Sequence, residues 1–287
     1  MPSISSLPQV VRNAARLQQV VGVLTKYGLA PWLHQVPLDW LQQHFKTSQG
    51  DAIAHLSWPE RIRAAMAELG PTFIKLGQIL STRSDIVGPE LAEELSRLQS
   101  NTPPDDPKAV RALVEAELKR PIAELFSTFD DTPVASGSIG QVHRATLNDG
   151  TAVAVKVQHS GIEEKIRSDL EIAMELARLV ETHSTEAALY RPTATISELK
   201  RALLTELDFC SELRSCQSFA HNFRNDSSVR FPDVHPELST RRVLTMSYLN
   251  GTPFSDRAAL TEAGCNLQKL SEQGARVFLE MIFRDGF

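Results

Sequence analysis

The sequence predicts an α+β protein in which a helical region precedes a small antiparallel sheet that long helices interrupt. The first hundred residues carry amphipathic helical patterns. Two strand-like runs, 141–147 and 151–157, meet at the turn-forming residues 148–150 (Asn-Asp-Gly). The helical patterns after this hairpin are separated by short apolar runs, and this order does not match the alternation that builds a parallel sheet.

The expected helices are placed by their apolar spacing and by proline or glycine near their ends. They cover 59–69, 71–83, 89–99, 107–118, 162–180, 196–223 and 266–284. Besides the hairpin, short strands are expected at 230–234 and 242–249. The breaker cluster 101–105 (Asn-Thr-Pro-Pro-Asp) is the best candidate for a domain boundary.

Composition excludes several classes of protein. A net charge of −5 argues against general nucleic-acid binding. The three cysteines lack metal-ligand spacing, so we expect free thiols in a reducing compartment and no metal motif. No run approaches the ~18 apolar residues that span a bilayer, and residues 1–20 lack the apolar core of a secretory signal. These features predict a cytoplasmic protein.

The N-terminal segment is basic and amphipathic. Arg12, Arg16 and Lys26 precede the first acidic residue, Asp39, on an apolar helical pattern. Such a helix can lie on an anionic membrane surface as a peripheral anchor, and it can also imitate an organelle transit peptide. A helix that packs on its own protein, with its basic side chains in water, explains the pattern equally well.

The segment 135–157 is the most informative. It opens with a loop of small residues, 135–140, and its second strand is apolar except for Lys156. On a strand, Val153, Val155 and Val157 share one face, while Ala154 and Lys156 share the other. A lysine there must reach water or an anion. Alone it would be read as a sheet-edge lysine that reaches solvent; with the loop and turn we favour a nucleotide site.

Two further motifs carry polar residues. Lys75, Gly77 and Gln78 lie in an expected helix, where Gly77 costs roughly 1 kcal/mol relative to alanine. Its expected benefit is close approach of another backbone; a packing glycine beside surface polar residues is the alternative, and the pattern does not choose between them.

Glu206, Asp208 and Glu212 form an acidic cluster that can supply a helix-borne partner for Lys156. A solvated acidic face is the alternative for each carboxylate. Glu206 and Glu212 do not share a face of a straight helix, so the helix must bend if both enter one site.

Together these motifs resemble the UbiB family of atypical, protein-kinase-like proteins, over the segments 70–99, 134–158 and 206–212. The resemblance implies a kinase-like N-lobe preceded by a helical extension that folds over the active site. It implies that Lys75, with Gln78 beside it, pairs with Glu206, and that Lys156 contacts nucleotide and pairs with Glu212. Asp208 belongs to the same Glu-x-Asp signature.

The resemblance also implies the nucleotide-binding residues. The loop matches the family's alanine-rich loop, with glycine in place of its central alanine, and 246–249 matches the inter-lobe hinge. The implied nucleotide contacts, besides Lys156, are Ala135, Ser136, Gly137, Ser138, Ile139, Gly140, Met246 and Tyr248.

The resemblance implies three regions: a helical extension at 1–105, the N-lobe at 106–250 and the start of a C-lobe at 251–287. The family continues into a catalytic loop and an Asp-Phe-Gly metal site, which this sequence lacks, so the ligands for the expected Mg²⁺ are absent and the chain reads as truncated. The implied function is ATP binding in support of ubiquinone or related isoprenoid-lipid metabolism, with little or no activity by itself. The implied partners are nucleotide, an isoprenoid lipid or membrane surface, and a second copy in a homodimer. A non-catalytic nucleotide- or lipid-associated scaffold is the alternative.

Overall fold

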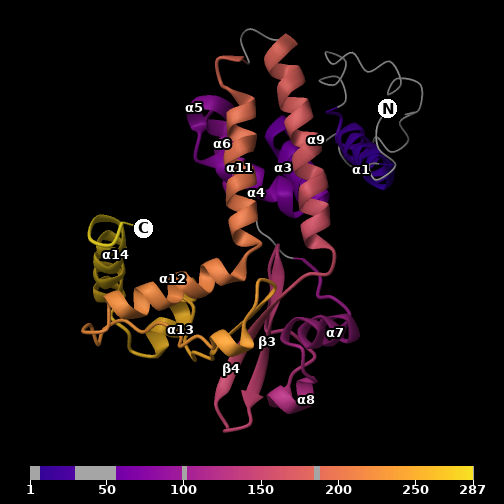
Figure 1. The fold of residues 1–287 in the computed structure, drawn as a ribbon. Coiled ribbons are helices and arrows are strands. Elements are labelled where there is room, and N and C mark those ends of the chain that lie inside the picture. Colours follow the sequence, from indigo (N-terminus) through magenta and orange to yellow (C-terminus); the bar gives the residue numbers. More distant parts are fainter. Residues whose placement is uncertain (1–6, 30–55, 99–101, 184–187, 287) are drawn as a thin grey trace. The chain divides into compact units, whose positions relative to one another are not determined.

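The computed structural model describes residues 7–29, 56–98, 102–183 and 188–286. The chain divides into two compact units (Figure 1). The helical unit comprises 1–104, 136–140 and 159–207. The sheet unit comprises 105–135, 141–158 and 208–287.

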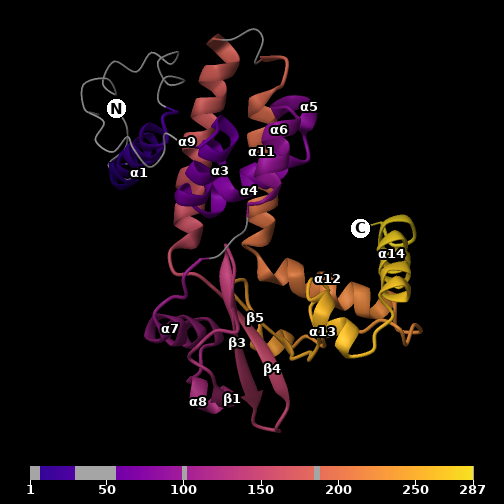
Figure 2. The ribbon, with the colours of Figure 1, turned by 180° about the vertical axis from the view of Figure 1, so that it is seen from behind.

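Seven helices make up the described part of the helical unit. They are α1 (Leu7–Lys26), α3 (Trp58–Leu69), α4 (Pro71–Ser81), α5 (Ser84–Val87), α6 (Pro89–Ser96), α9 (Ile162–His183) and α11 (Pro192–Glu206). Proline stands in the first turn of α3, α4, α6 and α11, where its missing N–H has no helical partner to lose. Figures 1 and 2 both show α9 and α11 side by side.

Two clusters of buried apolar side chains pack α4 against its neighbours in the helical unit. Phe73 packs with Val20 of α1 and Leu69 of α3. Ile74 packs with Leu91 and Leu95 of α6. The sequence predicted one helix over 71–83, but α4 ends at Ser81 and the short α5 follows.

The sheet unit holds an antiparallel sheet in the order β1–β3–β4–β5, with the two-residue β2 (Ala135–Ser136) beside β3. Its main strands are β1 (Phe126–Phe129), β3 (Gly140–Leu147), β4 (Ala152–Gln158) and β5 (Val243–Ser247). The predicted hairpin is confirmed: the N–H of Leu147 donates to the carbonyl of Thr151, and Gly150 takes a φ of 89° that glycine favours. The sequence did not predict β1.

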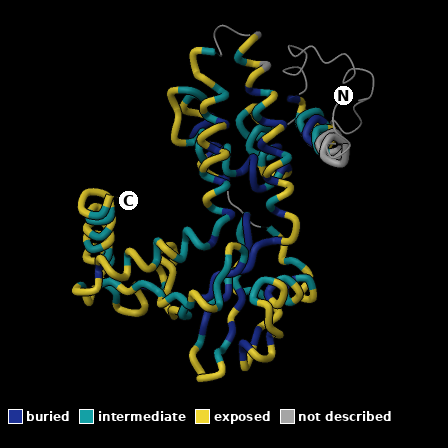
Figure 3. Tube along the Cα trace, in the orientation of Figure 1, coloured by how far each residue is buried: buried dark blue, intermediate teal, exposed yellow. Residues whose placement is uncertain are grey.

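One face of this sheet carries the core of the unit, and Figure 3 shows the buried residues along its strands. The predicted facing of the three valines is confirmed, since all three side chains are completely buried. The helices α7 (Pro107–Leu118) and α8 (Ile122–Leu125) cover them through Val110, Val114, Ile122 and Leu125.

The predicted helix over 196–223 is wrong as a single element. The chain forms α11 and then α12 (Phe209–Asn222), with Asp208 in extended conformation between them. The Asp208 carboxylate accepts a hydrogen bond from the N–H of Cys210 at 3.1 Å. Asp208 is therefore the N-cap of α12, a position where aspartate is strongly preferred.

The predicted strand over 230–234 is also wrong. Only Val234 makes a bridge there, to Met246 of β5. The segment is held by other contacts than a ladder of β-sheet hydrogen bonds. The N–H of Asp233 donates to the side chain of Ser247 at 2.9 Å, and the 3₁₀ turn η3 (Pro236–Leu238) follows.

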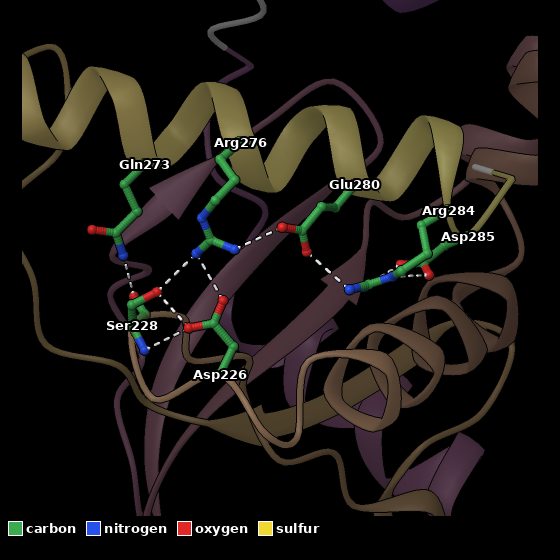
Figure 4. A network of polar contacts seen from close by, with 7 residues as sticks. All are labelled: Asp226, Ser228, Gln273, Arg276, Glu280, Arg284 and Asp285. Carbon is green, nitrogen blue, oxygen red and sulfur yellow. Dashed lines mark hydrogen bonds and ion pairs between the residues drawn. The ribbon is translucent and has the colours of Figure 1, made fainter.

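The sheet unit ends with α13 (Arg257–Glu262) and α14 (Leu267–Phe283). Figure 4 shows how polar contacts attach α14 to the loop after α12. Arg276 binds Asp226 at 2.7 Å, and hydrogen bonds from Ser228 and Arg276 lower the pKa of Asp226 to about 2. No residue of α14 is buried, whereas Phe278 and Phe283 are exposed.

Candidate functional site

Lys156 lies in the interior of the sheet, because β4 pairs with β3 on one side and β5 on the other. The alternative of a sheet-edge lysine is therefore wrong. Its ammonium contacts Glu212 Oε2 at 2.5 Å, and its side chain is 26% exposed. The pairing of Lys156 with Glu212 is confirmed, and the lysine side chain as a whole remains partly exposed.

The partners of Lys156 come from α12. Glu212 stands in the first turn of that helix, and the ring of Phe209 lies beneath the ammonium at 4.8 Å from its centroid. Phe209 is itself buried, so it anchors the start of α12. Asp208 acts indirectly. It caps α12, the helix that carries Glu212 and Phe209, and no contact that the structure shows joins it to Lys156.

Cys216 is a neighbour that the sequence did not assign. It stands one helical turn after Glu212, and burial raises the pKa of its thiol, with the Glu212 carboxylate adding to the rise and Lys156 opposing it. The thiol therefore stays protonated near neutral pH. A spacing of four residues from Glu212 on a helix is the signal that could have placed it there.

The small-residue loop has a defined backbone. The N–H of Gly137 donates to the carbonyl of Gly140 at 2.9 Å, and the His159 ring nitrogen Nε2 lies 3.0 Å from the carbonyl of Gly137. The N–H of His159 donates to the carbonyl of Ile139. The hydroxyl of Ser136 is buried and has no hydrogen-bond partner among the described residues, so the loop holds an unsatisfied polar atom. Ala135 is exposed and Ser138 half-buried.

The predicted hinge residues lie on and just after β5. Met246 pairs with Ala154 across the ladder. The N–H of Tyr248 donates to the carbonyl of Ala152 at 3.0 Å. The guanidinium of Arg144 lies over the ring of Tyr248, 4.9 Å from its centroid, and the sequence did not single out this arginine.

The Lys75–Glu206 pair is also confirmed: the Lys75 ammonium donates to Glu206 Oε1. It joins α4 to α11, which both belong to the helical unit, so this pair does not by itself link the two units. Gln78 donates to the carbonyl of Leu98 at 3.2 Å and so supports the chain after α6.

The structure decides between the two interpretations of Gly77. A Cβ at this position would collide with side-chain atoms of Leu98 and Met66 and would touch Leu95 at 3.4 Å. Gly77 is therefore a packing glycine, as the alternative expected, because side chains from α3, from α6 and from Leu98 just after α6 are its nearest neighbours.

The helical unit contains a buried ion pair that the sequence missed. Arg16 Nε contacts Asp169 Oδ1 at 2.5 Å, and the two side chains are 9% and 0% exposed. Arg16 also donates to the carbonyl of Leu69, and the Thr72 hydroxyl donates to Asp169 Oδ2 at 2.8 Å. No local pattern relates residues so far apart in the chain.

These contacts bear on the basic N-terminal helix. Arg16 is committed to Asp169, and Lys26 binds Glu68 at 2.8 Å. The described part of α1 thus packs on the protein itself, as one of the three interpretations expected, but Arg16 is buried in an ion pair and not solvated as that interpretation had it. The side chain of Arg12 lies outside the described residues.

Two features are absent from the described ranges of the chain. Within them, no group of three or more His, Cys, Asp or Glu side chains is placed to hold a metal ion. In the same part of the chain, no helix is long and apolar enough to cross a membrane.

Comparison with known proteins decides the family. Residues 97–287 match the model of the ABC1 atypical kinase-like domain, which is more than half of the chain. The chain belongs to the ABC1 atypical kinase-like family. The family expected from the motifs is confirmed, and with it the α+β, kinase-like N-lobe.

Several similar curated proteins are named probable protein kinase UbiB. One from Shewanella loihica is 37% identical over 96% of this chain and 51% of its own length. Another, from Shewanella sp. strain W3-18-1, is 39% identical over 93% of this chain and 50% of its own length. The chain thus spans about half the length of these relatives.

A solved structure is also similar. It is the complex of Rv3197 with erythromycin from Mycobacterium tuberculosis, with 29% identity over 67% of this chain and 48% of that chain, at a TM-score of 0.49.

Proposed function

We propose that this chain is a nucleotide-binding portion of a UbiB-type atypical kinase, and that ATP binds on the sheet face that carries Lys156. The observation that carries the proposal is the Lys156–Glu212 pair. A lysine on an inner strand, 26% exposed and held by one carboxylate, offers a positioned cation with room for an anionic oxygen.

Within the sheet unit, we propose that Met246 and Tyr248 contact the nucleotide together with Lys156. Contacts from the loop 135–140, most of which belongs to the helical unit, are a proposal that rests on the family alone. We assign structural roles to the other polar residues: Asp208 caps α12, Gln78 supports the chain after α6, and the Lys75–Glu206 pair joins α4 to α11. The proposal that α4 forms a lid over the nucleotide stays a prediction.

We expect no metal-dependent ATP hydrolysis from this chain alone, and this expectation rests on the family resemblance, whose metal-binding motifs the sequence lacks. ATP turnover that survives purification and disappears in Lys156→Ala would contradict this. Support of ubiquinone or other isoprenoid-lipid metabolism, contact with a membrane surface and homodimer formation are proposals that rest on the family alone.

Ligand-dependent stabilisation tests nucleotide binding. ATP at 100 times its Kd should raise the free energy of unfolding by about 2.7 kcal/mol, and Lys156→Ala should abolish most of that rise. Lys26→Ala is the matched control, because it removes another lysine of a partly exposed ion pair, 44% exposed, and lies in the helical unit. If ATP stabilises neither the parent nor the control, the chain is better described as a non-catalytic scaffold.

A further inference from the structure

Arg144 crosses the sheet face on which we place the nucleotide. It starts on β3, and its guanidinium lies over Tyr248, which directly follows β5. Because β4 lies between β3 and β5, the Arg144 side chain must pass over β4 to reach that ring.

The alternation of side chains fixes which face this is. Ala145, the next residue, is buried in the core with Val153 and Val155, so Arg144 points to the opposite face. Lys156 points to that same opposite face, since it also alternates with the buried valines. Arg144 and Lys156 therefore share one face of one sheet.

The two ends of this face differ in chemistry. Lys156 at one end offers a compact charge to an anion. Toward the Tyr248 end of this face, the β4 residues are Ala152 and Ala154. Their side chains are small, so they project little from the surface of the sheet. Ala152 and Lys156 are four residues apart, about 13 Å along a strand. At the far end the guanidinium of Arg144 lies over the ring of Tyr248.

We propose that Arg144 and Tyr248 form the base-binding end of this face, where the Arg144 guanidinium contacts the flat surface of the nucleotide's base while Lys156 binds its phosphates. The proposal rests on the proposed nucleotide binding. Planar cations and aromatic rings both stack on bases. A surface arginine that only covers a tyrosine would make the same contact without affecting any ligand, and the experiment separates the two.

The test measures affinity for two probes, ATP and inorganic tripolyphosphate, which has no base. Competition against labelled ATP allows millimolar affinities to be read. Arg144→Ala should weaken ATP binding about five- to tenfold and change tripolyphosphate binding less than about twofold. Arg144→Lys keeps the charge but loses the plane, so it should weaken ATP to an intermediate degree.

Arg111→Ala is the matched control. Arg111 also stacks on a ring of the sheet unit, 5.4 Å from the centroid of Phe129, but Phe129 belongs to the core face. Its removal should leave both affinities unchanged. The unfolding midpoint of each variant shows whether it folds.

The outcomes are distinct. If Lys156→Ala weakens ATP binding and Arg144→Ala does not, the base-binding role of Arg144 is overturned while the proposed function stands. If Arg144→Ala weakens ATP and tripolyphosphate equally, Arg144 is a phosphate contact and this inference is also overturned. If Lys156→Ala binds ATP as well as the parent, the proposed function itself fails.

Discussion

The surroundings of Asp169 and those of Lys156 differ in how completely each charge is enclosed. Asp169 is fully buried and receives hydrogen bonds from Arg16 and Thr72. Lys156 has one carboxylate and one ring as partners and is 26% exposed. A charge enclosed by protein groups supports the fold, whereas a charge with an open side can still bind a ligand. The difference assigns Asp169 to stability and Lys156 to function.

The largest test of this comparison is Asp169→Ala. It would leave the Arg16 guanidinium buried without its carboxylate, so we expect a loss of about 3–5 kcal/mol in the free energy of unfolding. Glu212→Ala is the counterpart, since the pair it breaks is partly exposed, and it should cost about 0–1 kcal/mol. Urea unfolding measures both. Equal losses in the two variants would contradict the assignment.

Glycines inside helices extend the comparison. Gly77 in α4 faces side chains that a Cβ would overlap, so Gly77→Ala forces a shift worth about 1–3 kcal/mol. The ~1 kcal/mol gained in helix propensity offsets only part of this cost, because Leu98 is itself buried and has little room to move, and we expect net destabilisation. Gly274 in α14 has nothing within 4 Å of its Cβ position, so Gly274→Ala should stabilise by about 0.5–1 kcal/mol. Thermal or urea unfolding that gave both variants the same sign would refute the distinction.

The sheet unit also contains an enclosed titratable group, the buried side chain of His143. This ring is 1% exposed and stacks on Phe129, and its Nδ1 lies 2.7 Å from the carbonyl of Asp130. Burial lowers the pKa of His143 from its ordinary value of 6.5; the Asp130 carbonyl and Asp131 oppose this, and Arg111 adds to it. The imidazole is therefore neutral in the folded protein near pH 7.

Acid should therefore destabilise the sheet unit through His143. The unfolded chain binds the proton at higher pH than the folded chain, so the contribution is fully present above pH 6.5 and is lost as the pH falls below it. A difference of one between the pKa of His143 in the unfolded and in the folded chain changes the free energy of unfolding by about 1.4 kcal/mol. The measurement is the pH dependence of unfolding between about pH 7 and 5, compared with that of His143→Gln. Parallel curves for the two proteins would show that His143 does not contribute.

These tests also show where reasoning from the sequence succeeded. The hairpin could be predicted because its signals are local: alternating valines and a glycine turn. The cap at Asp208 was missed, although aspartate before a helical pattern is a start signal, because the apolar periodicity on both sides suggested one continuous helix.

The partners of the candidate site were a different problem. Lys156 predicted the need for an anion, while the choice of Glu212 came from the family resemblance. The Arg16–Asp169 pair and the Arg144–Tyr248 contact have no local signal. The partners lie 153 positions apart in the first case, and on β3 and just after β5 in the second. Such contacts depend on tertiary packing, which a single sequence does not contain.

The smallest expected effect concerns Lys75 and Glu206, whose side chains are 30% and 36% exposed. By the rule drawn from Asp169 and Lys156, this pair belongs with the open charges, although it lies in the helical unit. A double-mutant cycle with Lys75→Ala and Glu206→Ala should give a coupling of about 0.2–1 kcal/mol that shrinks in high salt. A cycle of Lys75→Ala with Glu68→Ala is the control, because Glu68 binds Lys26 instead and the effects should add. Coupling no larger than in the control would mean that Lys75 and Glu206 do not meet. Coupling above about 3 kcal/mol would place the pair with Asp169, as an enclosed structural contact rather than a charge left open for function.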